Sequence, residues 1–470
     1  MSSPPRRLAV IGAGVSGLGA ATELTRLAEE HSLPLSLSLY EASGRAGGKL
    51  NTATFAGAQV DLGAESLLLR GPETEALIAD LGLGPRLVRP ATTSAAIWNG
   101  RKLIPLPRDS VLGVPLYPWR RDVVRAAGIG GAARASLEPW LGRGEPDPDG
   151  ALGDFVGRRI GTTAFGRLVD PLVGGVYAGP ARQLSSGAVA PQLITAVRGG
   201  GSLLRGLRRI ADSEPRSSGM TPFASFESGL AQLVDGLVGT LPKGSLQLAQ
   251  PVTRLEPLER GRMRIHPQGG PATEIDGLIL ALPAPAAASL LDQISSELVS
   301  LLRQLEYASV ATITLAYPDT GFDRPLTGSG FLVRRRPRRT VTACTFLDRK
   351  WPHLRQPGLA LLRASVGSFG DEWALALDDT TLVTTVHREL RTILELTALP
   401  VEARVERWHG ALPQYRAGHL NWRGRVSATA SQLPIRLELA GAAYGGIGIA
   451  ACLQEGAQAA RALWHQLSSS

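Results

Sequence analysis

Three glycines near the start of the chain have the spacing of a dinucleotide-binding turn. Gly12, Gly14 and Gly17 follow the apolar run 8–11 directly, and an amphipathic segment comes next. In a strand–turn–helix unit the first glycine permits the turn, the second admits a pyrophosphate, and the third lets the helix lie close to the strand. The N–H groups at the start of the helix then hold the phosphates. The segment predicts a cofactor site made of Gly12, Ala13, Gly14, Val15, Ser16 and Gly17.

Because the chain contains 55 glycines, the neighbouring segments must support this interpretation. Residues 33–41 alternate between apolar and polar types, as in a strand, and end at Glu41. The interval from Gly14 exceeds the usual one of about 20 residues, so residues 30–32 would loop out. Glu41, with Ala42 beside it, is expected to accept hydrogen bonds from an adenosine ribose. A solvated carboxylate at the end of a strand is the alternative.

A second glycine-rich segment follows at Arg45, Gly47, Gly48 and Lys49. Its paired glycines allow another close backbone approach, and its two cations would lie near a pyrophosphate. Together with Glu41, this pattern resembles the superfamily of flavin-dependent amine oxidases and protoporphyrinogen oxidases. In that group the pattern binds FAD rather than NAD, so the resemblance implies a non-covalent FAD cofactor.

Residues 52–66 are expected to form a strand pair and a loop. In the resembling family this loop passes the flavin ring, which implies cofactor contacts from Gly63, Ala64, Glu65 and Ser66. Arg70 follows, where relatives often carry a cation near the substrate. We therefore expect Arg70 to bind a substrate carboxylate; an exposed arginine before the helix expected at Pro72 is the alternative.

Two later segments narrow the resemblance. Residues 170–185, with Gly-Val-Tyr-Ala-Gly at 175–179, are similar to a segment of protoporphyrinogen and coproporphyrinogen oxidases that other amine oxidases lack. Paired glycines suit a flat substrate, and Gly175 is the expected contact. The run 407–419 resembles the same family nearly position for position. Its Trp408 is expected to wall the flavin, with core packing as the alternative, and His419 is not assigned as a base.

The resemblance also implies cofactor contacts late in the chain. Val252 matches the position whose backbone meets the adenine. Residues 439–449 resemble the C-terminal FAD motif, which implies contacts from Gly446, Ile447, Gly448 and Ile449 before a helix that starts near residue 450. Amine oxidases proper usually carry a lysine near the flavin on the strand comparable to 308–317. The absence of lysine there counts against an amine substrate.

Composition excludes several other classes. The chain has 470 residues, 44% of them apolar and 19% charged, which is ordinary for a globular protein of two or three domains. No pattern for nucleic-acid binding, a metal cluster or a membrane span is present. Its two cysteines show no disulfide framework, so a reducing, cytoplasmic location is expected, with peripheral membrane contact and oligomeric state left open.

The implied fold class is α/β. It comprises a Rossmann-like FAD-binding domain (1–95, 215–290 and 425–470), an inserted α-helical domain resembling a membrane-binding one (96–210), and a mixed-sheet substrate domain (291–424).

The implied activity is FAD-dependent oxidation of coproporphyrinogen III to coproporphyrin III by O2 in heme biosynthesis. Protoporphyrinogen IX is the close alternative substrate. Another flavin oxidoreductase, or a binding protein of the same fold that lacks redox activity, is more remote. The net charge of +9 and the arginines at 101, 108, 120, 121 and 182 favour the substrate with four carboxylates. The run 334–339 is most simply a solvated loop, and no catalytic base is assigned.

Overall fold

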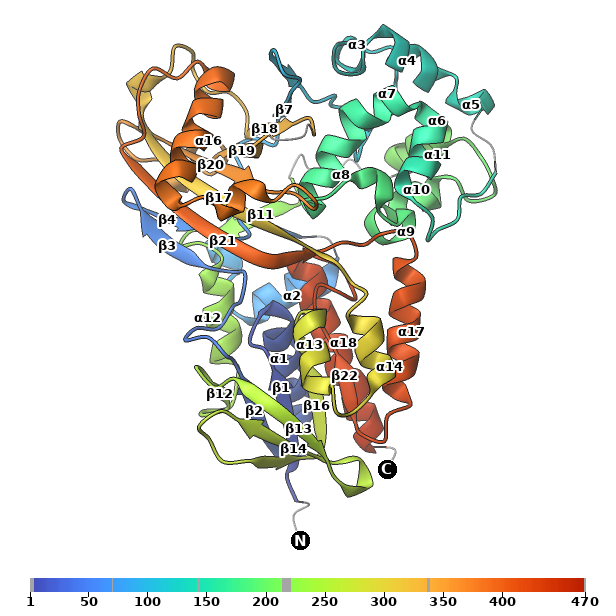
Figure 1. The fold of residues 1–470 in the computed structure, drawn as a ribbon, viewed down its shortest axis with the longest axis vertical. Coiled ribbons are helices and arrows are strands. Elements are labelled where there is room, and N and C mark those ends of the chain that lie inside the picture. The colour runs from blue at the N-terminus through green and yellow to red at the C-terminus, as the bar shows by residue number, and fades with distance from the viewer. Residues whose placement is uncertain (1–3, 70, 142–143, 214–220, 336–338, 469–470) are drawn as a thin grey trace.

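The computed structural model describes residues 4–69, 71–141, 144–213, 221–335 and 339–468. Figure 1 shows a lower part built on a parallel sheet, an upper part built on a larger sheet, and a group of helices beside the larger sheet. The chain passes between these parts several times, so each contains segments that are far apart in the sequence.

The lower part is organised by a five-stranded parallel sheet with the strand order β12-β2-β1-β16-β22. Its strands are β1 (Arg6–Ile11), β2 (Leu35–Tyr40), β12 (Leu246–Gln247), β16 (Gly277–Leu280) and β22 (Leu437–Leu439). Strand β1 lies at the centre because its residues 8–11 are apolar and buried on both faces. Helices α1 (Val15–Glu30) and α18 (Ile449–Ser468) pack together against one face. A Cβ on Gly456 would lie 2.0 Å from the carbonyl oxygen of Ser16, so glycine permits this close packing.

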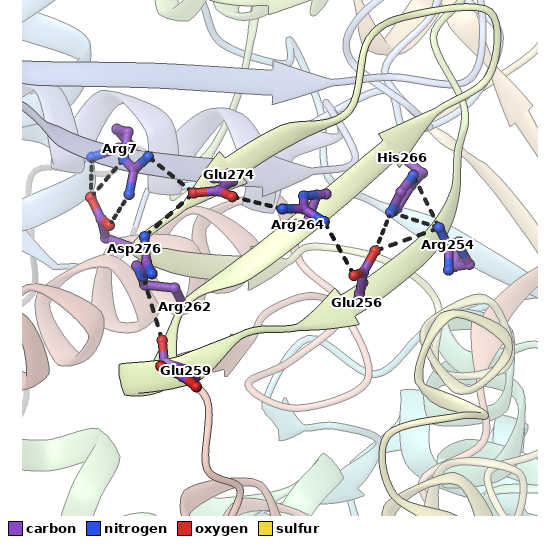
Figure 2. A network of polar contacts seen from close by, with 9 residues as sticks. All are labelled: Arg7, Arg254, Glu256, Glu259, Arg262, Arg264, His266, Glu274 and Asp276. Carbon is purple, nitrogen blue, oxygen red and sulfur yellow. Dashed lines mark hydrogen bonds and ion pairs between the residues drawn. The ribbon is translucent and has the colours of Figure 1, made fainter.

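The other face of the parallel sheet is covered by three helices and a small antiparallel sheet. These elements are α13 (Ala284–Leu291), α14 (Ser296–Leu302), α17 (His419–Ser431), β13 (Val252–Pro257), β14 (Met263–Pro267) and β15 (Thr273–Ile275). Figure 2 shows the polar network on the outer side of the small sheet, where Arg264 lies between Glu256 and Glu274. Because these charges are exposed, they orient neighbouring strands more than they stabilise the fold.

The upper part contains a seven-stranded mixed sheet in the order β21-β17-β20-β19-β18-β7-β8. Its strands are β21 (Glu402–Pro413), β17 (Tyr307–Pro318), β20 (Leu359–Val366), β19 (Val341–Phe346), β18 (Gly330–Val333), β7 (Ala95–Trp98) and β8 (Leu103–Pro105). Only the β18–β7 pairing is parallel among these strands of the described chain. Helix α16 (Asp379–Leu394) packs its buried face on this sheet. Asp378 caps the helix by accepting a hydrogen bond from Thr381 N.

The group of helices follows β8 in the chain. It comprises α3 (Arg121–Ala127), α4 (Ile129–Ser136), α5 (Glu138–Leu141), α6 (Arg158–Ile160), α7 (Thr162–Ala164), α8 (Asp170–Tyr177), α9 (Ser186–Val189), α10 (Pro191–Ala196) and α11 (Leu203–Ser213). Its core holds a buried ion pair between Arg159 and Glu138, 3.0 Å apart. Glu138 also accepts hydrogen bonds from Leu203 N and Leu204 N, which fixes the start of α11.

Shorter elements connect these parts: β3 (Thr52–Phe55), β4 (Ala58–Asp61), β5 (Leu67–Leu68), α2 (Pro72–Asp80), β6 (Leu87–Val88), β9 (Ser110–Val111), β10 (Val114–Pro115), β11 (Phe223–Phe226), α12 (Ala231–Gly239) and α15 (Leu347–Lys350). The predicted α/β class is confirmed. The three domain ranges stay a prediction; β7 and β8, which begin the expected helical insertion, pair within the seven-stranded sheet. No helix in the described ranges combines the length and apolar character that a membrane crossing requires.

Candidate active site

The glycine turn after β1 is tightly packed at two of its glycines and open at the third. Gly12 has a φ of +100°, and a Cβ there would lie 2.5 Å from the carbonyl oxygen of Ala281. A Cβ on Gly17 would lie 1.8 Å from the carbonyl oxygen of Gly12, so α1 can lie this close only with glycine. A Cβ on Gly14 would meet no atom within 4 Å. The space in front of Gly14 is therefore available to a ligand.

The start of α1 supplies hydrogen-bond donors to that space. The first hydrogen bond of the helix runs from Leu18 N to Gly14 O, 2.9 Å. The N–H groups of Val15, Ser16 and Gly17 precede it, and they are the donors that a phosphate at a helix N-terminus uses.

The second glycine loop lies against the first. Gly47 N donates to Ala13 O at 2.8 Å, and a Cβ on Gly48 would lie 3.2 Å from the Cα of Gly14. Arg45 donates to the carbonyl oxygens of Gly48 (2.7 Å) and Leu50 (3.0 Å), so its guanidinium maintains the shape of this loop. Its predicted role toward a pyrophosphate stays a prediction.

Lys49 follows Gly48 in the second glycine loop. Its side chain is accessible, yet desolvation by the protein around it lowers its pKa. Both observations fit a cation inside a recess rather than on an open surface. An anionic ligand in the recess would favour the charged ammonium.

Glu41 follows β2 and reaches the glycine turn. Its Oε2 accepts a hydrogen bond from Ala13 N (2.9 Å), and its Oε1 accepts from Ser43 N and Ser43 Oγ (2.9 and 2.7 Å). The segment leading to Val252 runs beside it, since Gln250 N donates to Glu41 O at 2.9 Å. Ala42 is exposed next to this carboxylate. The structure thus brings together the residues predicted for the adenosine end of the cofactor.

Arg363 of β20 holds the loop that follows β4. Nη1 of Arg363 donates to the carbonyl oxygens of Asp61 (2.8 Å) and Gly63 (3.0 Å), and Nη2 pairs with Glu65. Glu65 also pairs with Lys350. Burial disfavours the charge of Glu65, but attraction by Arg363 and Lys350 outweighs it and lowers its pKa to about 2. Glu65 is therefore ionised and paired with these two cations. Ser66 is the next residue of the loop.

Trp408 of β21 packs on the same loop. A Cβ on Gly63 would lie 2.1 Å from the carbonyl oxygen of Lys49 and 3.0 Å from Cζ2 of Trp408, while Ala64 N donates to Lys49 O at 3.4 Å. Nε1 of Trp408 is buried and has no hydrogen-bond partner within the described part of the chain. A buried donor that has no protein acceptor is suited to a ligand that brings one.

The C-terminal glycines adjoin the start of α18. Gly446 has a φ of +137°, and Cys452 N donates to Gly448 O at 2.9 Å as α18 begins at Ile449. A Cβ on Gly448 would meet nothing within 4 Å. Ile447 packs against the core of the helical group. Since α18 packs along α1, these glycines lie near the first glycine turn.

A cleft opens between α8 and the seven-stranded sheet. The paired glycines Gly174 and Gly175 and the turn at Gly179 line one wall, and β17 to β21 line the other. The open space is about 850 Å³, part of it continuous with solvent. Thr312 lines the cleft and donates through Oγ1 to Leu62 O at 2.7 Å. The cleft therefore ends at the loop that carries Gly63.

The charged groups of the cleft are Arg334, Arg335, Arg339, Asp170 and Asp371. Burial raises the pKa of Asp170, against the opposing attraction of Arg335. In the run 334–339, expected to be a solvated loop, the described arginines Arg334, Arg335 and Arg339 line the cleft, and Arg335 is exposed. Arg70 lies outside the described residues. Of the other predicted arginines, Arg120 pairs with Asp109 at the surface.

Sequence reasoning missed Arg363 and Thr312. A signal existed for Arg363, which is the one charged residue in the mostly apolar strand Leu359–Val366. A charge at such a position requires a buried partner. Thr312 belongs to an alternating strand and carries no comparable signal.

The donor set fits FAD. The groups that suit it are the N–H groups at the start of α1, the open position at Gly14, Glu41 at the end of β2 and the unpaired Nε1 of Trp408. Fold and site together define a flavin-dependent oxidoreductase. The chain belongs to the flavin-containing amine oxidoreductase family, whose model matches residues 15–464.

Within this family the chain is similar to coproporphyrinogen III oxidases along its whole length. It is 31% identical to the Bacillus subtilis enzyme over 97% of both chains, and 36% identical to the Mycobacterium leprae enzyme over 97% of this chain and 98% of that one. A crystal structure from Exiguobacterium, provisionally assigned as a protoporphyrinogen oxidase, matches with a TM-score of 0.87 at 30% identity, covering 99% of this chain and 100% of that chain. The predicted family and its FAD cofactor are confirmed.

Proposed function

We propose that this protein oxidises coproporphyrinogen III to coproporphyrin III, with non-covalently bound FAD and with O2 as the final electron acceptor. The observation that carries the proposal is the cleft, which is lined by paired glycines and by arginines, and from which Thr312 donates to Leu62 O in the loop that carries Gly63. The similarity to coproporphyrinogen III oxidases supports the same substrate. Overall, one porphyrinogen and three O2 would give one porphyrin and three H2O2.

Bound FAD supplies the two-electron acceptor for hydride removal from a methylene bridge. The residues of this chain bind the cofactor and the substrate and orient them toward each other. The N–H groups of Val15, Ser16 and Gly17 hold the phosphates, and Glu41 accepts from the ribose. Arg363 keeps the Asp61–Glu65 loop in one conformation, so the reacting faces meet at a fixed position.

The substrate would lie flat against the backbone of Gly174, Gly175 and Gly179. Side chains at these positions would crowd the cleft wall, because a Cβ on Gly174 would lie 2.7 Å from Gly179 O and one on Gly179 would lie 2.0 Å from Gln414 Oε1. Such a wall excludes water from the face of the macrocycle. No residue is proposed as a catalytic base, since positioning beside the acceptor is the main requirement.

Arginines at the cleft favour coproporphyrinogen III, with four carboxylates, over protoporphyrinogen IX, with two. We also propose a cytoplasmic location, which agrees with the free thiols of Cys344 and Cys452.

The proposal is tested by anaerobic mixing. The purified protein should be yellow, with flavin absorbance near about 450 nm. Coproporphyrinogen III added without O2 should bleach this band, and admitted O2 should restore it while porphyrin fluorescence rises. A yellow protein that coproporphyrinogen III does not bleach would overturn the proposed activity, and a colourless one without affinity for FAD would favour a binding protein of the same fold.

A further inference from the structure

Two arginines stand at the rim of the cleft with their charge only partly used by protein groups. Arg335 is exposed, and its Nη2 donates to a neutral acceptor, the carbonyl oxygen of Phe369, at 2.8 Å. Nη1 of Arg339 lies 3.9 Å from Oε2 of Glu389, which is beyond hydrogen-bond distance. The Glu389 carboxylate instead accepts from Thr340 N and Val341 N, at 3.0 and 3.1 Å.

The neighbouring Arg334 makes a structural contact instead. Its Nη2 donates to Ala126 O at 2.9 Å, so it connects the end of β18 to helix α3. This contact fixes the segment that carries Arg335. The residue before Arg335 is therefore held by α3.

Two acids line the cleft, Asp170 and Asp371, and Arg335 attracts the first of them. Asp170 accepts a hydrogen bond from Ala181 N at 3.0 Å, which directs one oxygen to the backbone of its own wall. Asp371 belongs to the turn closed by hydrogen bonds between its backbone and that of Ser368. The residues that line the cleft carry three guanidinium groups and two carboxylates, a positive excess within the lining, while Glu389 lies outside it at 3.9 Å from Arg339. A planar guanidinium binds a carboxylate through two parallel N–H groups, so this excess suits carboxylates.

We propose that Arg335 and Arg339 form an anion-recognition rim that binds carboxylates projecting from the substrate, and that this rim gives the preference for a tetracarboxylate over a dicarboxylate tetrapyrrole. The inference rests on the proposed function, since it names what distinguishes substrates in the same cleft. Thr312, which lines the cleft, donates to Leu62 O in the loop that carries Gly63 and that is expected to pass the flavin. A carboxylate at the rim lies far from the reacting carbon and is bound equally in the ground and transition states, so it acts on KM rather than kcat.

The test uses the flavin-loaded protein and two unreactive probes, coproporphyrin III with four carboxylates and mesoporphyrin IX with two. Dissociation constants come from porphyrin fluorescence, for wild type, Arg335→Ala, Arg339→Ala and the double variant. We expect coproporphyrin III to bind about tenfold more weakly to the double variant, and mesoporphyrin IX to change by less than about twofold. Arg335→Lys keeps the charge but loses the paired geometry, and should fall between wild type and Arg335→Ala.

The matched control is Arg303→Ala. Arg303 is exposed at the end of α14 and pairs with Asp292 at 3.0 Å, so the variant removes one positive charge away from the cleft. It should leave both constants unchanged. Flavin content measured on every variant verifies folding, and Arg335→Lys provides a second variant if an alanine variant loses flavin.

Turnover measurements distinguish the role of Arg335 and Arg339 from the proposed function itself. With coproporphyrinogen III, the double variant should show a KM raised about tenfold and an unchanged kcat. If wild type oxidises coproporphyrinogen III and the variants have the same KM, Arg335 and Arg339 do not bind the substrate. If the dissociation constants of both probes rise equally, the two arginines do not distinguish four carboxylates from two. In either case the proposed function stands. If wild type oxidises no porphyrinogen, the proposed function falls and the substrate named here falls with it.

Discussion

Arg363 and Glu65 form a buried ion pair between strand β20 and the loop after β4, although 298 residues separate them in the chain. Lys350 joins the pair from α15. The pKa of Glu65, about 2, lies below the usual value near 4.5. Because the folded-state pKa is lowered, the pair stabilises the fold above about pH 4.5, and this contribution is lost as the pH falls toward about 2.

Glu65→Gln should destabilise the protein by about 3 kcal/mol, because it leaves two buried cations without their counterion. It should also reduce flavin content, since the loop at Gly63 loses its fixed conformation. Urea unfolding and the flavin-to-protein absorbance ratio measure both effects. Glu306→Gln, which removes a half-exposed pair with Arg416, is the control and should cost less than about 1 kcal/mol. Equal unfolding midpoints for the Glu65 variant and wild type would refute the structural role.

Gly14→Val should give a folded protein that lacks FAD. Its side chain meets no protein atom near Cβ but occupies the space assigned to the pyrophosphate. We expect flavin content below about a tenth of wild type with an unchanged circular dichroism spectrum. Gly239, at the end of α12, has equal room, so Gly239→Val should keep its flavin. Full flavin content in Gly14→Val would mean that the cofactor lies elsewhere.

Asp61 gives a pH dependence of the opposite sign to that of Glu65. Burial raises its pKa to about 6, although it accepts hydrogen bonds from Thr52 Oγ1 (2.6 Å) and Leu230 N (2.9 Å). A raised folded-state pKa means that its contribution is full below about pH 4 and is lost as the pH rises through about 6.

Asp61→Asn keeps the accepting oxygen and removes the titration. The Tm of this variant relative to wild type should therefore rise by about 2 °C or more between pH 4 and pH 8. Asp292→Asn, at an exposed pair with Arg303, should show a constant difference. A constant difference for Asp61→Asn as well would show that Asp61 does not titrate in this range.

Local spacing predicted the strand–turn–helix geometry at Gly12, Gly14 and Gly17 well, because each glycine acts on its immediate neighbours. The predicted strands at 8–11 and 33–41 correspond to β1 and β2, and the predicted helix near residue 450 corresponds to α18. The approach of Gly47 to Ala13 also follows from short segments on either side of β2. The resemblance of these motifs to a known family predicted the family and the fold class.

Long-range contacts were not predictable in this way. Nothing near Glu65 in the sequence indicates that Arg363 and Lys350 will bind it. The run 334–339 has the composition of a solvated loop, and nothing in it indicates that Arg334 and Arg335 line the cleft, where Arg334 donates to Ala126 O of α3. The contacts of Arg45 were not predicted either, although they are local: its guanidinium donates to carbonyl oxygens of its own loop.

The most direct test of the central claim is the ratio of kcat/KM for the two porphyrinogens, measured by porphyrin fluorescence in air-saturated buffer. We expect coproporphyrinogen III to be favoured over protoporphyrinogen IX by at least about tenfold, or roughly 1.4 kcal/mol in the transition state. A preference for protoporphyrinogen IX would contradict the assigned substrate, and inertness toward both would contradict the porphyrinogen oxidase activity itself.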